Sequence, residues 1–298
     1  MELSSQQHRN YTQNGFLILP KFFTEQELVP LKAWISRLVN ELATYLLAEG
    51  KIKSTYADKP LSTRLIWIEK EYPLASVCIH SLGEFSHELH EFSLQKPMIS
   101  LIETLLGKSP GLHPVWNLRA KTPQNPLATV PWHQDTAYLQ TGSESISQIT
   151  TWVPLFDVTL EQGPLVFIKG GHSQAKVYPH QLESGSGHPD SWYLKIAEDN
   201  LPKGEHIFCP VPAGSLVLFN QLIPHCCLEN FSKLIRWTID LRWQDPSLSN
   251  GMGAGKECLP IKSSMEQWDK WGKQKRAGQN LDTYNTTISG PWLDRWKV

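Results

Sequence analysis

The chain has 298 residues, 40% of them hydrophobic, and a net charge of −1 at pH 7, which is typical of a globular protein and leaves no basic footprint for nucleic acid. No segment is apolar for long enough to span a membrane, and the polar residues 1–13 lack the apolar core of a signal peptide. Five irregularly spaced cysteines argue against a disulfide framework and for a reducing compartment, so we expect a cytoplasmic protein. We also expect its partner to be a small molecule, and its oligomeric state is left open.

The first third of the chain is expected to be mostly helical. Thr24 and Glu27 form a capping box, and leucine and isoleucine then recur every three or four residues, which predicts a long amphipathic helix with a distortion at Pro30. In total, three helices are predicted, over 24–50, 84–92 and 97–106.

Short apolar runs separated by Gly and Pro predict strands in the middle of the chain. They cover residues 112–121, 148–157, 165–169, 206–210, 215–220 and 234–243. Helices followed by many short strands indicate a mainly β fold with flanking helices, namely a double-stranded β-helix, also called a cupin-like jelly roll. We expect one domain over 1–298, with helical support over 1–110, a jelly-roll core over 111–245 and a C-terminal extension over 246–298.

The strand predicted over 234–243 alternates strictly between apolar and polar residues. Its apolar face comprises Ile235, Trp237, Ile239, Leu241 and Trp243, and its polar face comprises Arg236, Thr238, Asp240 and Arg242. In a small barrel, such a strand packs with one face and turns the other to a hydrated lumen. We expect Arg236 to reach a ligand there, and Asp240 and Arg242 to form an internal salt-bridge ladder.

Two histidines and one aspartate have the spacing of a metal site. His133 and Asp135 stand in Trp132-His133-Gln134-Asp135, and with His225 they supply the two imidazoles and one carboxylate that occupy one face of octahedral Fe(II). Arg236, eleven residues after His225, suits the far carboxylate of a dicarboxylic co-substrate, because a guanidinium binds carboxylate bidentately. A second such motif, His188-Pro189-Asp190, lies in a Gly- and Ser-rich stretch with no comparable Arg-bearing strand after it, so the first pair is favoured.

Motifs along much of the chain resemble the phytanoyl-CoA dioxygenase family. The matching positions are Asn14 to Pro20 as an opening strand, Lys121, Trp152, Gly163 to Ile168, Gly170-Gly171-His172, and His225 and Arg236 at the family spacing. Cys227 departs from the family pattern, because a Ser or similar small polar group is expected near the co-substrate carboxylate. The region after Asp245 matches only loosely.

The resemblance implies an oxygenase that depends on Fe(II), 2-oxoglutarate and O2, with ascorbate as a further candidate cofactor. Fe(II) would be held by His133, Asp135 and His225, and no catalytic residue beyond these ligands is expected. Candidate residues for binding 2-oxoglutarate are Arg236, Trp152, Lys121 and Cys227. Lys121 shares a strand face with Asn117 and Arg119, and a solvated face explains this pattern nearly as well as a role beside 2-oxoglutarate. Cys226 and Cys227 beside His225 would suit a thiolate metal site, but no Cys-x-x-Cys pair supports one, so buried small hydrophobic groups are favoured.

The implied reaction is hydroxylation, or another oxidation such as dealkylation, desaturation or ring formation, with release of succinate and CO2. Halogenation is disfavoured because Asp135 is present. The chain has no basic cluster for the phosphates of an acyl-CoA and ends without a peroxisomal signal, so a natural product or amino-acid-derived metabolite is favoured. Two alternatives stay open: a cupin-like metal enzyme that does not use 2-oxoglutarate, and a non-catalytic jelly-roll protein that binds a metabolite.

Three segments are expected to enclose the site: 140–147, the long insertion 180–205, and the tail from Pro246. The tail carries Trp268, Trp271, Trp292 and Trp296. These side chains either line a substrate pocket or anchor the tail to the barrel, and anchoring is favoured.

Overall fold

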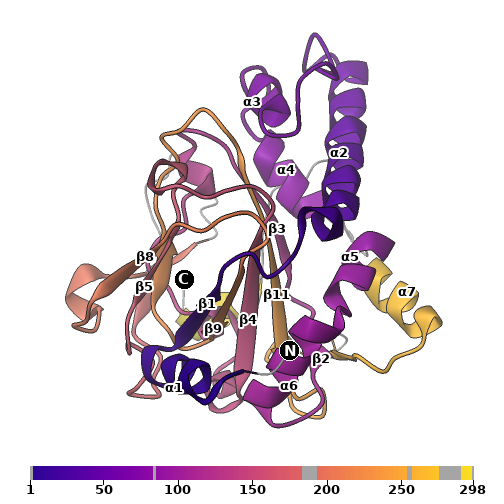
Figure 1. Ribbon diagram of the computed structural model, residues 1–298. Coiled ribbons are helices and arrows are strands. Elements are labelled where there is room, and N and C mark those ends of the chain that lie inside the picture. The colour runs from indigo at the N-terminus through magenta and orange to yellow at the C-terminus, as the bar shows by residue number, and fades with distance from the viewer. Residues whose placement is uncertain (1–2, 83–84, 183–192, 254–256, 275–289, 297–298) are drawn as a thin grey trace.

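Two antiparallel sheets form the core of the computed structural model, which describes residues 3–82, 85–182, 193–253, 257–274 and 290–296 (Figure 1). The larger, seven-stranded sheet has the order β1-β9-β4-β11-β2-β12, and β3 also pairs with β11. Its strands are β1 (Phe16–Leu19), β2 (Gly111–Leu112), β3 (Asn117–Lys121), β4 (Gln148–Pro154), β9 (Leu216–Asn220), β11 (Arg236–Gln244) and β12 (Leu259–Pro260).

The smaller sheet has three strands in the order β10-β5-β8, namely β5 (Leu165–Ile168), β8 (His206–Cys209) and β10 (His225–Cys227). A separate hairpin pairs β6 (His180–Leu182) with β7 (Leu194–Ile196), inside the insertion that the sequence predicted as a loop. The two main sheets do not close into a barrel. The prediction of a mainly β fold with flanking helices is confirmed.

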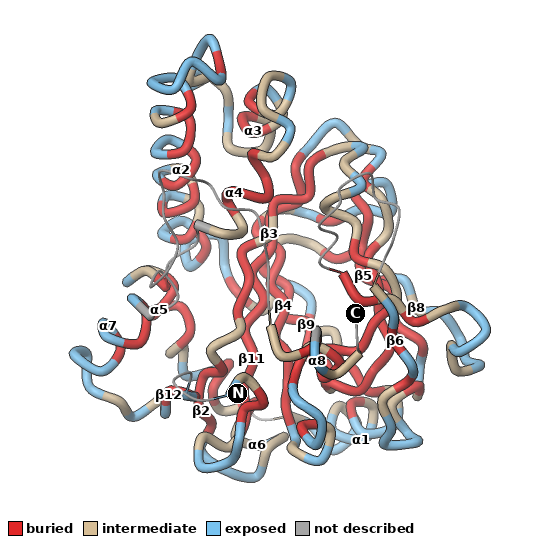
Figure 2. The backbone as a smooth tube through the Cα atoms, turned by 180° about the vertical axis from the view of Figure 1, so that it is seen from behind, coloured by how far each residue is buried: buried red, intermediate tan, exposed pale blue. Residues whose placement is uncertain are grey.

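Helices cover the outer face of the larger sheet, and in both views α2, α4 and α5 lie on the side away from β5 and β8 (Figures 1 and 2). The helices are α1 (Ser5–Asn14), α2 (Glu25–Ala48), α3 (Arg64–Glu69), α4 (Ala75–Leu82), α5 (His87–Ser93), α6 (Lys96–Leu106), α7 (Met265–Gln274) and α8 (Trp292–Trp296). Within the described residues, none of them combines the length and the apolar character needed to cross a membrane.

The long helix α2 forms as its sequence predicts. Thr24 and Glu27 make the reciprocal capping box, two acidic residues stand in the first turn, and the helix runs through Pro30 to Ala48. Its apolar stripe is buried in the main hydrophobic core: Leu28, Leu31, Ile35, Leu38, Leu42 and Leu46.

The strand β11 places its two faces as expected. Its apolar residues pack in the main core, and Arg236, Asp240 and Arg242 line a cavity between the two sheets. All nine residues of β11 are buried (Figure 2). The polar face of β11 therefore lines an interior cavity, as expected, and its charged side chains are little exposed and depend largely on partners within the protein.

We expect Thr24→Ala to lower the free energy of unfolding by about 1 kcal/mol, because one of the first amide groups of α2 loses its side-chain acceptor. Urea unfolding followed by circular dichroism measures the change. Thr104→Ala in α6 is the matched control, since the Thr104 hydroxyl bonds only a carbonyl of its own helix and caps nothing. An equal loss in both variants would contradict the capping argument.

Candidate functional site

Backbone pairing brings the two predicted metal histidines together. His133 and His225 face each other in an antiparallel bridge, with amide-to-carbonyl distances of 2.9 and 3.0 Å. His225 begins β10, which pairs with β5, so the bridge extends the smaller sheet by one residue. Asp135 opens a short 3-10 turn, Asp135–Tyr138, immediately after the bridge.

The three side chains converge, and the Nε2 atoms of both histidines are available to bind a metal ion. His133 Nδ1 lies 2.8 Å from the Pro131 carbonyl and His225 Nδ1 lies 3.0 Å from the Ile223 carbonyl, so each ring donates through Nδ1 and leaves Nε2 as an acceptor. The two Nε2 atoms lie 3.8 and 4.0 Å from Asp135 Oδ1. Two imidazole nitrogens and one carboxylate oxygen, all buried and this close, fit a divalent transition-metal ion.

Burial and charge set the protonation states that metal binding needs. Burial, aided by the neighbouring His225, holds the pKa of His133 well below its ordinary value, and burial also lowers the pKa of His225. Both rings are therefore neutral at physiological pH. Burial alone would raise the pKa of Asp135, but the Arg242 guanidinium and the nearby histidines more than offset this and keep the carboxylate ionised.

Arg242 and Thr150 hold the Asp135 carboxylate. Arg242 donates to both oxygens, at 2.7 Å to Oδ1 and 3.2 Å to Oδ2, and the Thr150 hydroxyl donates to Oδ2 at 2.6 Å. Each carboxylate oxygen has two acceptor positions, so Oδ1 retains one for a cation.

The expected salt-bridge ladder between Asp240 and Arg242 is wrong. Asp240 instead pairs with Arg119 of β3 at 2.9 Å, and Arg242 pairs with Asp135. Side chains two residues apart on one strand face point the same way. Closer counter-ions therefore come from neighbouring strands and from the segment that carries His133 and Asp135, here called the metal loop.

Gln134, between the two ligands, fixes the metal loop. Its side-chain amide donates to the Leu222 carbonyl at 2.7 Å and to the Lys176 carbonyl at 3.0 Å, and its carbonyl oxygen accepts from the Tyr178 amide at 2.7 Å. Its own backbone amide donates to His180 Nε2 at 3.1 Å. The segments around Tyr178 and Leu222, which are distant in sequence, are thereby hydrogen-bonded to the residue between His133 and Asp135.

Arg236 lies in the same cavity and is incompletely paired. It is 2% exposed, donates from one terminal nitrogen to the Gly163 carbonyl, and stacks 5.7 Å from the Trp152 ring centroid. Its buried Nε has no hydrogen-bond partner among the described residues. Gly163 has φ +67°, and a Cβ there would meet the Leu228 carbonyl at 2.2 Å. The backbone conformation that presents this carbonyl to Arg236 therefore requires glycine.

Lys121 and Cys227 form a direct contact at the Arg236 end. Lys121 Nζ lies 2.9 Å from Cys227 Sγ, and Lys121 pairs in register with Arg236 on the neighbouring strand. Burial lowers the pKa of Lys121 to about 8. Burial would raise the pKa of Cys227, but the charges of Lys121 and Arg236 bring it below its ordinary value. The expected solvated strand face is therefore absent here, since Lys121 is 1% exposed.

The cavity between the two sheets has about 390 Å3 of empty space, counted to where it opens to solvent. Its lining includes all three metal-site residues together with Trp152, Cys227 and Arg236; Lys121 reaches it only through Cys227. The motif His188-Pro189-Asp190 lies outside the described residues.

The three segments expected to enclose the site contribute no lining side chain among the described residues. Trp268 and Trp271 pack in the main core instead. Trp292 packs against Ala137, and Trp296 donates to the Ala137 carbonyl at 2.9 Å, behind the metal loop. These contacts fit the anchoring interpretation of the tail.

Arg242 and Thr150 are the residues that sequence reasoning missed. The alternation of β11 correctly placed Arg242 on the face of Arg236, and this was the only available signal. Thr150 lies in an unbroken buried run, Gln148–Pro154, where nothing in the sequence distinguishes a hydroxyl that supports a ligand from one that packs.

Comparison with known families matches residues 11–237 to the model of the family Phytanoyl-CoA dioxygenase (PhyH). A Dictyostelium discoideum relative described as phytanoyl-CoA dioxygenase domain-containing protein 1 homolog is 23% identical over 252 residues, which are 78% of this chain and 88% of the relative. Phytanoyl-CoA dioxygenase 1 of Oryza sativa subsp. japonica is 24% identical over 260 residues, covering 80% of this chain and 88% of that protein.

Solved structures with a similar fold include two non-haem enzymes and a protein with bound 2-oxoglutarate. The non-heme monooxygenase ThoJ aligns with TM-score 0.60 and 16% identity, covering 91% of this chain and 93% of its own. SnoK, an alpha-ketoglutarate-dependent carbocyclase from nogalamycin biosynthesis, has TM-score 0.55, 17% identity and coverages of 88% and 94%. EctD from S. alaskensis, solved with 2-oxoglutarate and 5-hydroxyectoine, has TM-score 0.52, 15% identity and coverages of 88% and 87%. These likenesses confirm the jelly-roll fold.

Asp135→Ala should abolish tight metal binding, because the single anionic ligand is lost and Arg242 is left without its counter-ion. Fe(II) or Mn(II) titration under anaerobic conditions measures the affinity. Asp190→Ala, in the other His-x-Asp motif, should bind metal like the wild type. Loss of metal from the Asp190 variant alone would transfer the assignment to that motif.

Arg242→Gln should weaken metal affinity by roughly tenfold to a hundredfold, because the ligating carboxylate loses the groups that orient it. Arg119→Gln is the matched control, since it breaks the neighbouring ion pair with Asp240 and leaves Asp135 untouched. The same titration applies to both. Equal losses in the two variants would mean that Arg242 acts only through general stability.

Proposed function

Because the chain belongs to the phytanoyl-CoA dioxygenase family, we propose that it is an Fe(II)- and 2-oxoglutarate-dependent oxygenase that oxidises a small metabolite, by hydroxylation or a related step, and releases succinate and CO2. One observation carries the proposal. Three buried ligand atoms and an incompletely paired guanidinium share one cavity of about 390 Å3. A cluster of potential metal ligands and a guanidinium that line the same cavity suit a metal-bound dicarboxylate.

His133, Asp135 and His225 would hold Fe(II), which with 2-oxoglutarate and O2 supplies the oxidising power. Arg236 then binds the distal carboxylate of 2-oxoglutarate with its free donors. The Gly163 carbonyl and the Trp152 ring hold the guanidinium in place, so little side-chain freedom is lost when the carboxylate binds. Trp152, Leu165 and Phe219 provide apolar walls that exclude water.

A small substrate with a hydrogen-bond donor fits this cavity best. Asp240 lines it, and Asp240 Oδ1 is buried with no hydrogen-bond partner among the described residues. A hydroxyl or amino group of the substrate would satisfy that oxygen. A natural product or amino-acid-derived metabolite carries such groups. Among the similar structures, SnoK belongs to nogalamycin biosynthesis and EctD was solved with 5-hydroxyectoine. We expect the reaction to take place in the cytoplasm.

Succinate release tests the proposal. The protein is incubated with Fe(II), 2-oxoglutarate, O2 and a panel of hydroxylated or amino-bearing metabolites, with and without ascorbate, and succinate is measured. We expect turnover that a matching metabolite stimulates and that Asp135→Ala abolishes. Binding of metal and metabolite with no 2-oxoglutarate turnover would identify a cupin-like metal enzyme or a binding protein instead.

Arg236 variants test the co-substrate anchor. Arg236→Ala should weaken 2-oxoglutarate binding by about 1.5–3 kcal/mol, roughly tenfold to a hundredfold, because a charge-assisted hydrogen bond is lost. Arg236→Lys keeps the charge without the planar fork and should lose less. The absorption band of the 2-oxoglutarate–iron complex follows the titration.

Lys121→Met is the matched comparison, since it removes a cation that does not line the cavity. A larger loss in this variant than in Arg236→Ala would make Lys121 the anchor. Metal affinity should stay unchanged in the Arg236 variants, because Arg236 is not a ligand.

A further inference from the structure

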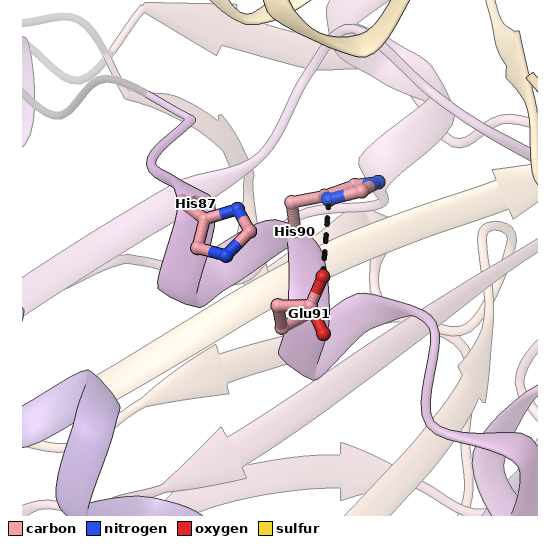
Figure 3. A group of neighbouring side chains, drawn as sticks. All are labelled: His87, His90 and Glu91. Atoms are coloured by element: carbon pink, nitrogen blue, oxygen red, sulfur yellow. Dashed lines mark ion pairs between the residues drawn. The ribbon is translucent and has the colours of Figure 1, made fainter. Parts of the chain in front are cut away.

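A second group of potential metal ligands lies on α5, outside the cavity. His87, His90 and Glu91 stand at positions i, i+3 and i+4 and therefore share one face of this helix. Each offers one ligand atom, and these three atoms lie within 4.8 Å of one another. Figure 3 shows both imidazoles and the carboxylate gathered beside the helix, with a dashed line from His90 to Glu91.

His90 carries the second observation, because its imidazole is buried and lacks a partner. The residue is 4% exposed, and neither ring nitrogen makes a hydrogen bond within the described part of the chain. A Glu91 oxygen lies 3.8 Å from Nδ1, which is too far for a hydrogen bond. A buried polar atom without a partner is costly and calls for a ligand, an ion or a water.

The surroundings of the His90 ring fix its orientation and its protonation state. The His90 ring packs 4.1 Å from the ring of Trp268 on α7, which fixes its orientation. Burial lowers the pKa of His90, so the ring is neutral and has a lone pair. Glu91 and Asp269 add negative charge close by, and both raise the pKa of His90, which partly offsets the effect of burial.

We propose that His87, His90 and Glu91 bind a divalent transition-metal cation of the Zn(II) type, at a site separate from the oxygenase centre. Ligand atoms around Zn(II) with bonds of about 2.1 Å stand roughly 3.4 Å apart, and His90 and Glu91 are at 3.8 Å already. His87 and Glu91 are exposed, so small side-chain rotations close the remaining gap. Water would complete the coordination, as at other sites with two histidines and one carboxylate.

The position of this site separates it from catalysis. α5 and α7 lie on the helical side of the larger sheet, and the strands β5 and β8 of the smaller sheet lie on the other side (Figures 1 and 2). A cation here would hold the first turn of α5 in place beneath Trp268. It should therefore raise the thermal stability of the protein without changing the affinity for 2-oxoglutarate.

Zn(II) titration by calorimetry tests the proposal on the full chain. Wild type should bind about two equivalents, and His133→Ala/His225→Ala about one. In the wild-type background, His87→Ala and Glu91→Gln should each weaken Zn(II) binding at the α5 site at least tenfold. Each should also remove the rise in melting temperature that this binding causes. Both residues are exposed, so these variants avoid the risk that a change at buried His90 prevents folding.

Glu88→Gln is the matched control, because it removes the same charge from the same helix while its carboxylate pairs with Arg37 outside the cluster. His8→Ala controls for loss of an exposed helical histidine. Unchanged Zn(II) affinity in His87→Ala overturns the proposal. So does a loss in Glu88→Gln as large as that in Glu91→Gln, because binding would then depend on charge alone.

Discussion

The buried ion pair between Asp135 and Arg242 is the interaction on which the site depends. A carboxylate removed from water costs several kcal/mol unless it is paired, and the Asp135 side chain is only 2% exposed. Arg242 belongs to β11, which lies in the interior of the larger sheet between β4 and β3, so the pair ties the metal loop to a rigid strand. The orientation of Asp135 toward the two imidazoles is therefore set by the protein before any cation arrives.

The same strand organises the other end of the cavity. Arg236, Asp240 and Arg242 share its buried polar face, and each finds its partner on a different element: the turn before β5, strand β3 and the metal loop. One strand thereby fixes the distance between Asp135 and Arg236. Because its opposite face packs in the main core, a shift in its register would move both groups together.

Local patterns in the sequence predicted a large part of this arrangement. The capping box at Thr24 located α2, the alternation of β11 located its two faces, and the residues His133, Asp135 and His225 meet as expected. The partner of Arg242 could not be predicted, because alternation gives the face of a side chain but not its neighbour across the sheet. The short helix α3 was missed because its six residues are too few to show a recognisable apolar period. α1 could have been found, since Ser4 and Gln7 form a capping box.

Cys227, the departure from the family pattern, has a physical reason in the charge balance around it. Lys121 and Arg236 stand opposite each other in the β3–β11 register, and two buried cations side by side repel. Cys227 contacts Lys121, and its lowered pKa allows it to carry the compensating negative charge, which a serine hydroxyl could not do. With Cys227 ionised, the two cations and one thiolate leave a single net positive charge. The proposed function places the distal carboxylate of 2-oxoglutarate at this end of the cavity, where such a charge favours an anionic group over a neutral one.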